Sequence, residues 1–215
     1  MRQDPDSITQ LGGWLFRHRT ALPLPFAAAI LGLRTGQAPP STGLVVTGVV
    51  VTLAGELLRL WGVHHIGAIS RTRADRLGPL VSSGPFGIVR NPLYLGNIAI
   101  WIGFALTARL VWLAPVILIL LGLEYHAIVR WEEQLLESRR GDEYRDYTSR
   151  VPRWFPRLSN RGDRRGNESH KEKKISAVSA VNAGGQTWHA TLFSERGTLL
   201  AIGAGYLLLY LKARF

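Results

Sequence analysis

Long apolar stretches separated by polar, basic segments are the dominant pattern of this chain. The apolar stretches cover residues 21–33, 43–63, 93–107, 110–129 and 198–211. A membrane-spanning helix needs about 20 mostly apolar residues, and the stretches at 43–63 and 110–129 reach that length. The other three are shorter, and the last is predicted either to cross the membrane or to lie at its surface. The pattern predicts an all-α, polytopic transmembrane helical protein with about five membrane helices.

Two of these stretches form a predicted hairpin. Residues 93–107 and 110–129 are joined only by Ala108 and Arg109, and so short a link forces two helices to run antiparallel. Both ends of the hairpin therefore return to the same membrane face. We expect residues 90–94 to lie near residues 130–133, although a whole hairpin separates them in sequence.

The charged segments indicate how the chain is divided. Residues 1–63 are predicted to form N-terminal membrane helices, 64–158 a central core, 159–197 a charged linker, and 198–215 a C-terminal membrane or interfacial helix. Within the core, residues 130–150 have apolar positions at roughly helical spacing, with Gly141 as a break. Pro152 is expected to end this helix.

Charge and composition narrow the class of partner. The chain of 215 residues carries a formal net charge of +11, and its basic residues flank the apolar stretches. This placement favours membrane lipids over nucleic acid as the partner, and the positive-inside rule puts the polar core segments in the cytoplasm. We expect an integral membrane protein, in the inner membrane if the source is bacterial. The absence of Cys excludes disulfides, thiolate nucleophiles and Cys-ligated zinc, and no metal site is expected.

The segment at residues 84–94 combines backbone freedom with polar groups. Gly84 and Gly87 let the backbone approach a ligand closely, and Pro92 fixes the start of the next helix. That helix start has free N–H groups, which suit an anionic or electron-rich atom. Arg90 and Tyr94 add a forked cation and an aromatic ring with a hydroxyl. The alternative is a capped helix start with a basic membrane anchor.

A second group of charges follows the hairpin. Glu132 and Glu133 come just after the apolar helix, where a carboxylate can bind an amine, ribose hydroxyls or a sulfonium-bearing ligand. Arg130 and Arg150 can hold a carboxylate or a phosphate at the membrane surface. The alternatives are a solvated helix face for the two acids and attraction to lipid head groups for the two arginines.

One acid and one base, Glu56 and Arg59, lie near the end of the apolar stretch at residues 43–63. A polar pair inside a membrane helix usually faces protein or a cavity. The alternative is that Arg59 runs along the helix and places its guanidinium at the membrane surface.

Two sets of motifs stand on either side of the hairpin. The first is Leu80-Val81 with Gly84-Pro85-Phe86, followed by Arg90-Asn91-Pro92-Leu93-Tyr94. The second is Glu132-Glu133 with Leu136, then Gly141 with Glu143-Tyr144 and Tyr147, and finally Arg150-Val151-Pro152. In order and spacing they resemble the motifs of the isoprenylcysteine carboxyl methyltransferase and phospholipid methyltransferase family of integral membrane methyltransferases. The resemblance covers about residues 78–156.

The resemblance implies a cofactor and a set of site residues. The cofactor is S-adenosyl-L-methionine, converted to S-adenosyl-L-homocysteine, in a pocket open to the cytoplasm. A lipophilic acceptor is expected to reach the site from the bilayer, and residues 64–158 become the catalytic core. The residues expected to line the cofactor site are Pro79, Leu80, Val81, Phe86, Asn91, Pro92, Leu93, Tyr94 and Glu132. The residues expected to act on the acceptor are Arg90, Arg130, Arg150 and Glu133, the last as a base for an amine acceptor.

The chain departs from the family pattern at two positions. Asn91 stands where the eukaryotic enzymes carry His. An amide donates and accepts hydrogen bonds but is no base near neutral pH, so residue 91 is expected to contact the cofactor and not to shuttle protons. Phe86 replaces the more usual Tyr, which removes a hydroxyl and keeps the ring.

The expected function is methyl transfer to a lipophilic, membrane-embedded acceptor such as an isoprenylcysteine-like carboxylate, a lipid or a lipidated peptide. Two alternatives stay open. One is a membrane reductase related to sterol reductases, which bind a nicotinamide dinucleotide and usually have more spans. The other is a non-catalytic membrane protein whose charged clusters are ordinary juxtamembrane charge. The sequence leaves open whether O, N or S is methylated and gives no role to residues 159–215.

Overall fold

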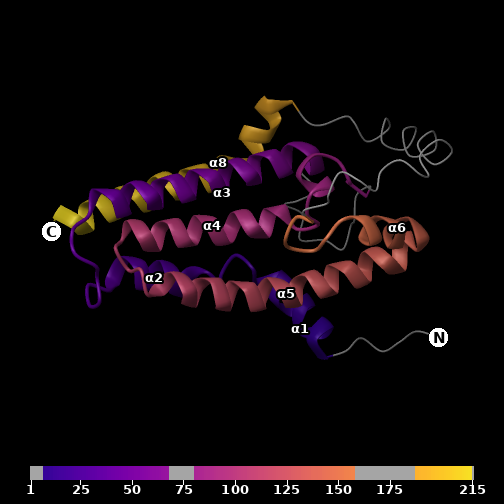
Figure 1. The fold of residues 1–215 in the computed structure, drawn as a ribbon, viewed down its shortest axis with the longest axis horizontal. Coiled ribbons are helices and arrows are strands. Elements are labelled where there is room, and N and C mark those ends of the chain that lie inside the picture. The colour runs from indigo at the N-terminus through magenta and orange to yellow at the C-terminus, as the bar shows by residue number, and fades with distance from the viewer. Residues whose placement is uncertain (1–6, 68–79, 158–186, 215) are drawn as a thin grey trace.

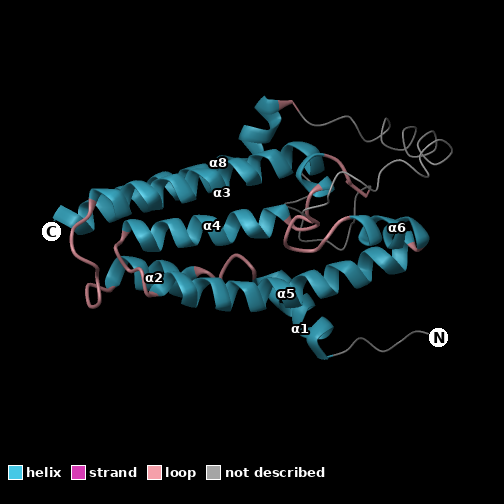
Figure 2. Ribbon diagram, viewed as in Figure 1, coloured by secondary structure: helices cyan, strands magenta, loops and turns pink. Residues whose placement is uncertain are grey.

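The computed structural model describes residues 7–67, 80–157 and 187–214, and every regular element in these ranges is helical (Figure 1, Figure 2). The elements are α1 (Ser7–His18), α2 (Leu24–Gly32), α3 (Thr42–Ile66), the short 3-10 helix η2 (Gly84–Gly87), α4 (Pro92–Thr107), α5 (Leu113–Arg140), α6 (Asp142–Arg150) and α8 (Trp188–Arg214). The all-α prediction is confirmed for these ranges. Pro79 and most of the predicted linker lie outside the described residues.

Three helices of the described chain, α3, α5 and α8, are long and apolar enough to cross a membrane. These are properties of an integral membrane protein. Helix α4 is apolar but has 16 residues, and α2 has 9, which is shorter than the roughly 20 residues that a full span needs. The predicted count of about five spans therefore depends on α2 and α4, which do not qualify by length.

Local sequence explains where the central helices begin and end. Ser41 caps α3, because its Oγ accepts a hydrogen bond from the Leu44 N–H at 3.3 Å. Pro92 occupies the first turn of α4, where the missing N–H has no helical partner to lose. Gly141, with φ at 52°, separates α5 from α6, so the predicted break is confirmed.

Helices α3 and α4 pack through glycines that recur every seventh residue. Gly48 and Gly55 on α3 face Gly103 and Gly96 on α4. A Cβ added at Gly55 would lie 2.7 Å from the Gly96 carbonyl oxygen, and one at Gly103 would lie 2.6 Å from the Gly48 carbonyl oxygen. The two backbones are in direct contact, as in the small-residue interfaces of membrane helices. We call this row of contacts between Gly48, Gly55, Gly96 and Gly103 the glycine seam. Its residues pair in reverse order, so α3 and α4 are antiparallel and the start of α4 lies beside the end of α3.

The C-terminal helix differs from its prediction. It begins at Trp188 and not at residue 198, and its 27 residues are long and apolar enough to cross a membrane. Thr191 and Glu195, in its first turns, are buried. Polar side chains that look like part of a linker in sequence are interior residues of the bundle, which is why the hydropathy pattern starts the helix too late.

Two further boundaries differ. Helix α5 continues without interruption to Arg140, so the apolar stretch and the first half of the charged segment form one helix. Near the N-terminus, where no helix is predicted, α1 packs on α5. Gly12 of α1 comes so close that an added Cβ would lie 2.0 Å from the Ala127 carbonyl oxygen. The missed signal is an amphipathic helix whose buried face consists mainly of small residues.

The apolar core lies between α4 and α5, where Leu110, Ile117 and Leu121 are fully buried. The outer faces of the long helices carry large apolar side chains that are exposed, among them Leu57 on α3 and Leu123 on α5. Outward-facing apolar surface on helices of spanning length is the surface that lipid covers in a membrane.

Candidate active site

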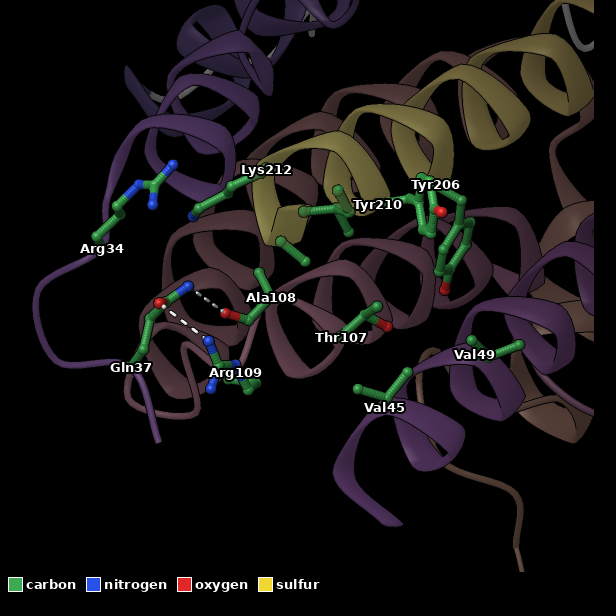
Figure 3. A pocket seen from close by; sticks show the side chains of 12 residues that line it. Arg34, Gln37, Val45, Val49, Thr107, Ala108, Arg109, Tyr206, Tyr210 and Lys212 are labelled. Carbon is green, nitrogen blue, oxygen red and sulfur yellow. Dashed lines mark hydrogen bonds between the residues drawn. The ribbon is translucent and has the colours of Figure 1, made fainter. Parts of the chain in front are cut away.

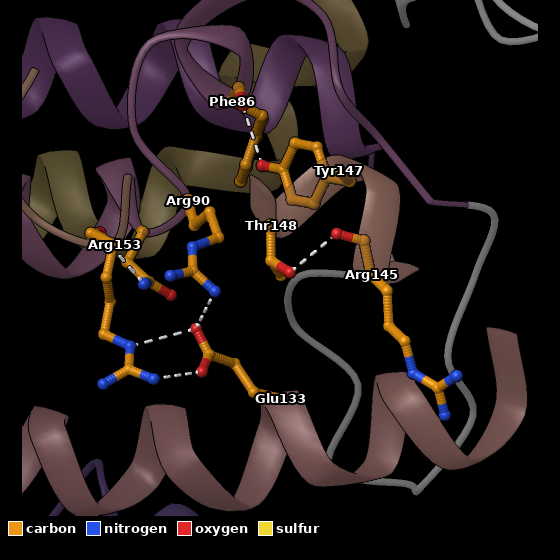
Figure 4. A network of polar contacts seen from close by, with 8 residues as sticks. Phe86, Arg90, Glu133, Arg145, Tyr147, Thr148 and Arg153 are labelled. Carbon is orange, nitrogen blue, oxygen red and sulfur yellow. Dashed lines mark hydrogen bonds and ion pairs between the residues drawn. The ribbon is translucent and has the colours of Figure 1, made fainter. Parts of the chain in front are cut away.

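The hairpin of α4 and α5 brings the two predicted clusters to one end of the bundle. Nη1 of Arg90, just before α4, lies 2.9 Å from Oε1 of Glu133 on α5 (Figure 4). Each of the two side chains is only 15% exposed, so the pair is largely shielded from solvent. The expected meeting of residues 90–94 with residues 130–133 is confirmed by this ion pair.

Glu133 is shared with a second arginine, Arg153, which follows α6. Nε of Arg153 donates to Oε1 at 3.1 Å, and Nη2 donates to Oε2 at 2.5 Å. This is a bidentate guanidinium–carboxylate pair, the stronger and more directional form of such a contact. Glu133 therefore has both oxygens occupied by two arginines. Arg153 is a site residue that the sequence prediction omits.

Three further hydrogen bonds fasten the loop before α4 to the segment after α5. The Arg90 backbone N–H donates to the Pro152 carbonyl oxygen at 2.9 Å. The Asn91 side chain donates to the Arg153 carbonyl oxygen at 3.2 Å. The Tyr147 hydroxyl donates to the Phe86 carbonyl oxygen at 2.7 Å. Segments that are distant in sequence are thus held as one unit by both side chains and backbone.

Burial affects the chemistry of the tyrosines on α6. Desolvation raises the pKa of Tyr147 well above its ordinary value of 10.0, with Arg90 acting in the opposite direction. Desolvation also raises the pKa of Tyr144. Both phenols stay protonated at neutral pH, so Tyr147 is a permanent donor to the loop.

Tyr94 and Glu132 form the second polar contact of the site. The Tyr94 hydroxyl donates to Oε1 of Glu132 at 3.1 Å, and the Tyr94 ring stacks on Tyr125 with centroids 4.6 Å apart. Next to Glu132, the ring of Trp131 packs against Phe16 of α1 at 4.9 Å. The helix missed by the sequence prediction therefore covers one side of the site.

The other predicted residues take different positions. Arg150 is half exposed and pairs with Asp146 one turn earlier on α6, Nη2 to Oδ2 at 2.7 Å. It does not join Arg90 and Glu133. Arg130 is half-buried on α5. Phe86 and Pro92 are buried, and the residues that are half-buried at the edge of the site are Leu80, Val81 and Leu93. Pro79 lies outside the described residues.

A separate ionic cluster lies within the helix bundle, on α3, α4 and α8. Arg59 contacts Glu56 on its own helix, Nε to Oε2 at 3.3 Å, and Glu195 on α8, Nη2 to Oε2 at 2.7 Å. It also donates to the Asn97 side chain on α4 and, at 3.4 Å, to the Thr198 hydroxyl. The Arg59 and Glu56 side chains are 13% and 6% exposed, so the polar pair faces protein and Arg59 does not extend to the membrane surface.

Groups of three or more His, Asp or Glu side chains that could hold a metal ion are absent from the described residues. His64 and His65, at the end of α3, contact other residues. The His64 ring stacks on Trp188 of α8 with centroids 4.1 Å apart, and the His65 ring nitrogen contacts the Trp61 carbonyl oxygen at 2.9 Å.

A bundle with helices long and apolar enough to cross a membrane, and with a half-buried junction of arginines, carboxylates and tyrosines at one end, has the features of an integral membrane protein with a polar site. Residues 44–142 match the phospholipid methyltransferase family, and the chain belongs to that family. The match spans α3, α4 and α5. It leaves out α8 and Arg153, both of which contact residues inside it.

Two similar proteins are named as metal resistance proteins. The nickel-cobalt-cadmium resistance protein NccN of Alcaligenes xylosoxydans xylosoxydans is 30% identical over 155 residues, which are 69% of this chain and 70% of NccN. The cobalt-zinc-cadmium resistance protein CzcN of Cupriavidus metallidurans is 30% identical over 116 residues, 54% of this chain and 50% of CzcN. No solved structure gives a significant match.

Proposed function

We propose that this protein transfers a methyl group from S-adenosyl-L-methionine to a lipophilic acceptor that reaches the site from the bilayer. The observation that carries the proposal is the junction of Arg90, Glu133 and Arg153, which joins the two motif clusters of a methyltransferase family at the end of an apolar helix bundle. Lipid-covered helices lead directly to this junction. The polar end of an acceptor can reach it while the apolar remainder stays in the membrane.

The residues on α4 and α5 fit the proposed cofactor by their chemistry. The first turn of α4 has no side-chain cap, so its backbone N–H groups are available to an anionic or electron-rich atom. Glu132, on the facing helix, offers a carboxylate for an amine or for ribose hydroxyls, and Tyr94 holds that carboxylate in place. When bound, the cofactor supplies an electrophilic methyl group on a sulfonium sulfur.

The reaction balances with no further reactant. A lone pair on the acceptor atom forms the new bond to the methyl carbon, and the carbon–sulfur bond breaks with its electron pair remaining on sulfur. An acceptor that carries a hydrogen on the reacting atom also loses a proton, whereas a carboxylate loses none. Since such a displacement depends on alignment of the two reacting groups, positioning by the protein supplies much of the rate enhancement.

The contacts of Glu133 bear on the kind of acceptor. A base must have an oxygen free to receive the proton, but both oxygens of Glu133 accept hydrogen bonds from Arg153, and one also meets Arg90. Glu133 can remove a proton from an amine only after that network opens. We therefore favour an acceptor whose reacting atom is already unprotonated, with Arg90 or Arg153 orienting it.

The test is calorimetric binding of S-adenosyl-L-methionine and S-adenosyl-L-homocysteine to the full chain purified in detergent. Glu132→Gln keeps the size of the side chain and removes its charge, and is expected to weaken binding at least tenfold. Glu137→Gln is the matched control, because Glu137 lies on the same helix but is about half exposed and is expected to leave binding unchanged. Equal binding by wild type and Glu132→Gln contradicts the assignment of Glu132.

Binding measurements on the same purified protein distinguish the proposed methyltransferase from a membrane reductase and from a non-catalytic protein. Saturable binding of a nicotinamide dinucleotide, with no binding of either adenosyl compound, replaces the proposal with a membrane reductase. Failure of folded protein to bind any of these compounds replaces it with a non-catalytic role. Transfer of a radiolabelled methyl group to material that partitions into organic solvent identifies the acceptor class.

We also propose that the site faces the cytoplasm. Since the chain has no Cys, single Cys substitutions can report sidedness with a membrane-impermeant maleimide. Ser149 is exposed at the site end of the bundle, and Thr35 is exposed at the opposite end. Labelling of Thr35→Cys, but not of Ser149→Cys, in intact cells is expected. The reverse pattern overturns the proposed orientation.

A further inference from the structure

A cavity of about 340 Å³ lies at the end of the bundle opposite to the Arg90–Glu133 junction (Figure 3). It is formed by the link after α2, the start of α3, the α4–α5 turn and the last turns of α8. Its polar lining includes Arg34, Gln37, Arg109, Lys212, Tyr206 and Tyr210. Its volume is within the range of about 300–1,000 Å³ that small-molecule sites occupy.

Among the described residues, three cations and no carboxylate line this cavity. Arg34, Arg109 and Lys212 come from three separate parts of the chain, and in the described residues none of them forms an ion pair with Asp or Glu. Like charges gathered around one space repel each other. A bound anion would relieve that repulsion.

Neutral groups hold two of the cations in place. Nζ of Lys212 donates to the Ile30 and Leu33 carbonyl oxygens at 2.7 and 2.5 Å. The Arg109 guanidinium donates to the Ala38 carbonyl oxygen and to the Gln37 side chain, each at 3.3 Å. These contacts fix where the positive charges stand and do not neutralise them.

The α4–α5 turn fixes the backbone at Arg109, where the Leu110 N–H donates to the Ala105 carbonyl oxygen at 2.9 Å in a left-handed helix end. Arg109 has φ at 62°, and it is the only residue other than glycine with positive φ in the described chain. That conformation is uncommon for a residue with a side chain and persists where the surroundings enforce it. Here the Arg109 carbonyl oxygen accepts a hydrogen bond from the Ala38 N–H at 2.8 Å, which ties the turn to the cavity wall.

Part of the wall is apolar and belongs to helices of membrane-spanning length. Val45 and Val49 on α3 and Leu209 on α8 line it, and α3 and α8 are of membrane-spanning length. A ligand that meets cations at the helix ends and apolar side chains farther along the helices has a charged head and a hydrocarbon tail. Basic pockets between membrane helices bind such lipids.

The distribution of charge along the whole protein points the same way. The positive-inside rule concentrates Lys and Arg at one membrane face, yet this protein has clusters at both ends of the bundle. At the junction end, arginines are matched by carboxylates. At the cavity end, Arg34, Arg109 and Lys212 have no acidic match among the described residues, so topology alone does not account for them.

We propose that this cavity binds the phosphate head group of an anionic glycerophospholipid, with Arg34, Arg109 and Lys212 facing the phosphate and the acyl chains lying along α3 and α8. The site is separate from the methyltransferase junction and requires no part of the proposed reaction.

The test measures retention of phosphatidylglycerol by the full chain in mixed micelles, titrated against phosphatidylcholine and read by native mass spectrometry. Phosphatidylglycerol is expected to bind in preference to phosphatidylcholine. Arg34→Gln is the first variant, because Arg34 forms no hydrogen bond or ion pair with the other described residues. Loss of one cation near a lipid phosphate is expected to weaken retention about fivefold.

Arg196→Gln is the control, since Arg196 lies on α8 over Phe193, away from the cavity. It is expected to leave retention unchanged. Arg109→Gln is a second cavity variant, and its effect should resemble that of Arg34→Gln. Equal retention by wild type and both cavity variants overturns the proposal. Displacement of the lipid by millimolar inorganic phosphate or glycerophosphate also overturns it, because the site would then take a free anion.

Discussion

Arg59 is the residue whose removal should destabilise the bundle most. It lies between two buried carboxylates, with Glu56 at 3.3 Å and Glu195 at 2.7 Å. Replacing Arg59 by Met preserves much of the side-chain volume but leaves two acids facing each other inside the protein. Replacing Glu195 by Gln leaves the Arg59–Glu56 pair intact. Arg59→Met should therefore destabilise the protein more than Glu195→Gln, although the two residues are partners in the same ion pair.

The geometry sets the expected magnitudes. Removing one partner of a buried ion pair costs about 3–5 kcal/mol, because the remaining charge is left buried. We expect Arg59→Met to fall in that range, since the Glu195 side chain is 1% exposed and Glu56 is 6% exposed. Glu195→Gln replaces an ion pair by a hydrogen bond from the guanidinium to a neutral amide oxygen, a loss of about 1 kcal/mol. The triple variant Arg59→Met, Glu56→Gln, Glu195→Gln is expected to recover most of the loss, because no buried charge remains.

The assay is equilibrium unfolding in mixed micelles with increasing SDS, followed by tryptophan fluorescence. Arg145→Met is the matched control. Arg145 also bridges two carboxylates, Glu137 and Asp142, both at 3.0 Å, but on the exposed surface of α5 and α6. Exposed pairs often contribute nothing measurable, and no measurable loss is expected. Free energies for Arg59→Met and Glu195→Gln that agree within about 1 kcal/mol would refute the reasoning.

Three further predictions follow from backbone positions and from the α6 tyrosine. Gly55→Ala places a methyl against the backbone of α4 and should cost about 1–3 kcal/mol, whereas Gly122→Ala, which meets nothing within 4 Å, should be neutral or stabilising in the same assay. Gly141→Ala should cost about 1–3 kcal/mol through its φ of 52° alone, since the space around it is open; a smaller loss contradicts the assigned bend. Tyr147→Phe removes the hydrogen bond to the loop and should make that loop more sensitive to protease. Because burial raises the Tyr147 pKa above its value of 10.0, stability is complete below pH 10 and falls as the pH rises above it, when only the unfolded phenol ionises; this alkaline loss should be smaller in Tyr147→Phe.

The meeting of the two motif clusters could be predicted because it depends on chain connectivity. Two apolar helices with a link of only a few residues have to return to the same end, so Arg90 and Glu133 had to be neighbours. No comparable constraint distinguishes Arg150 from Arg153. Arg150 is still helical and pairs with Asp146 on the same face. The chain becomes extended at Val151, and only this change of direction brings Arg153 back to Glu133.

The partners of α8 could not be read from sequence for a different reason. Glu195 lies in a polar stretch, and polar residues lower the hydropathy by which a membrane helix is recognised. Its burial follows from the position of Arg59 on another helix, which periodicity within α8 does not reveal. The glycine seam, in contrast, is predictable from the sequence. Glycines at 48, 55 and 62 and again at 96 and 103 are regularly spaced, and that spacing indicates two helices in close contact.

The glycine seam also determines which parts of the protein can move. Side chains between packed helices can change rotamer and let one helix slide or a guest molecule pass, but backbone atoms in contact have no such freedom. Gly96 shows how tight the fit is, because an added Cβ there would lie 2.7 Å from the Gly55 carbonyl oxygen. Helices α3 and α4 therefore behave as one rigid wall. If the proposed acceptor enters from the bilayer, it has to pass between other helices, with this wall as the surface against which they move.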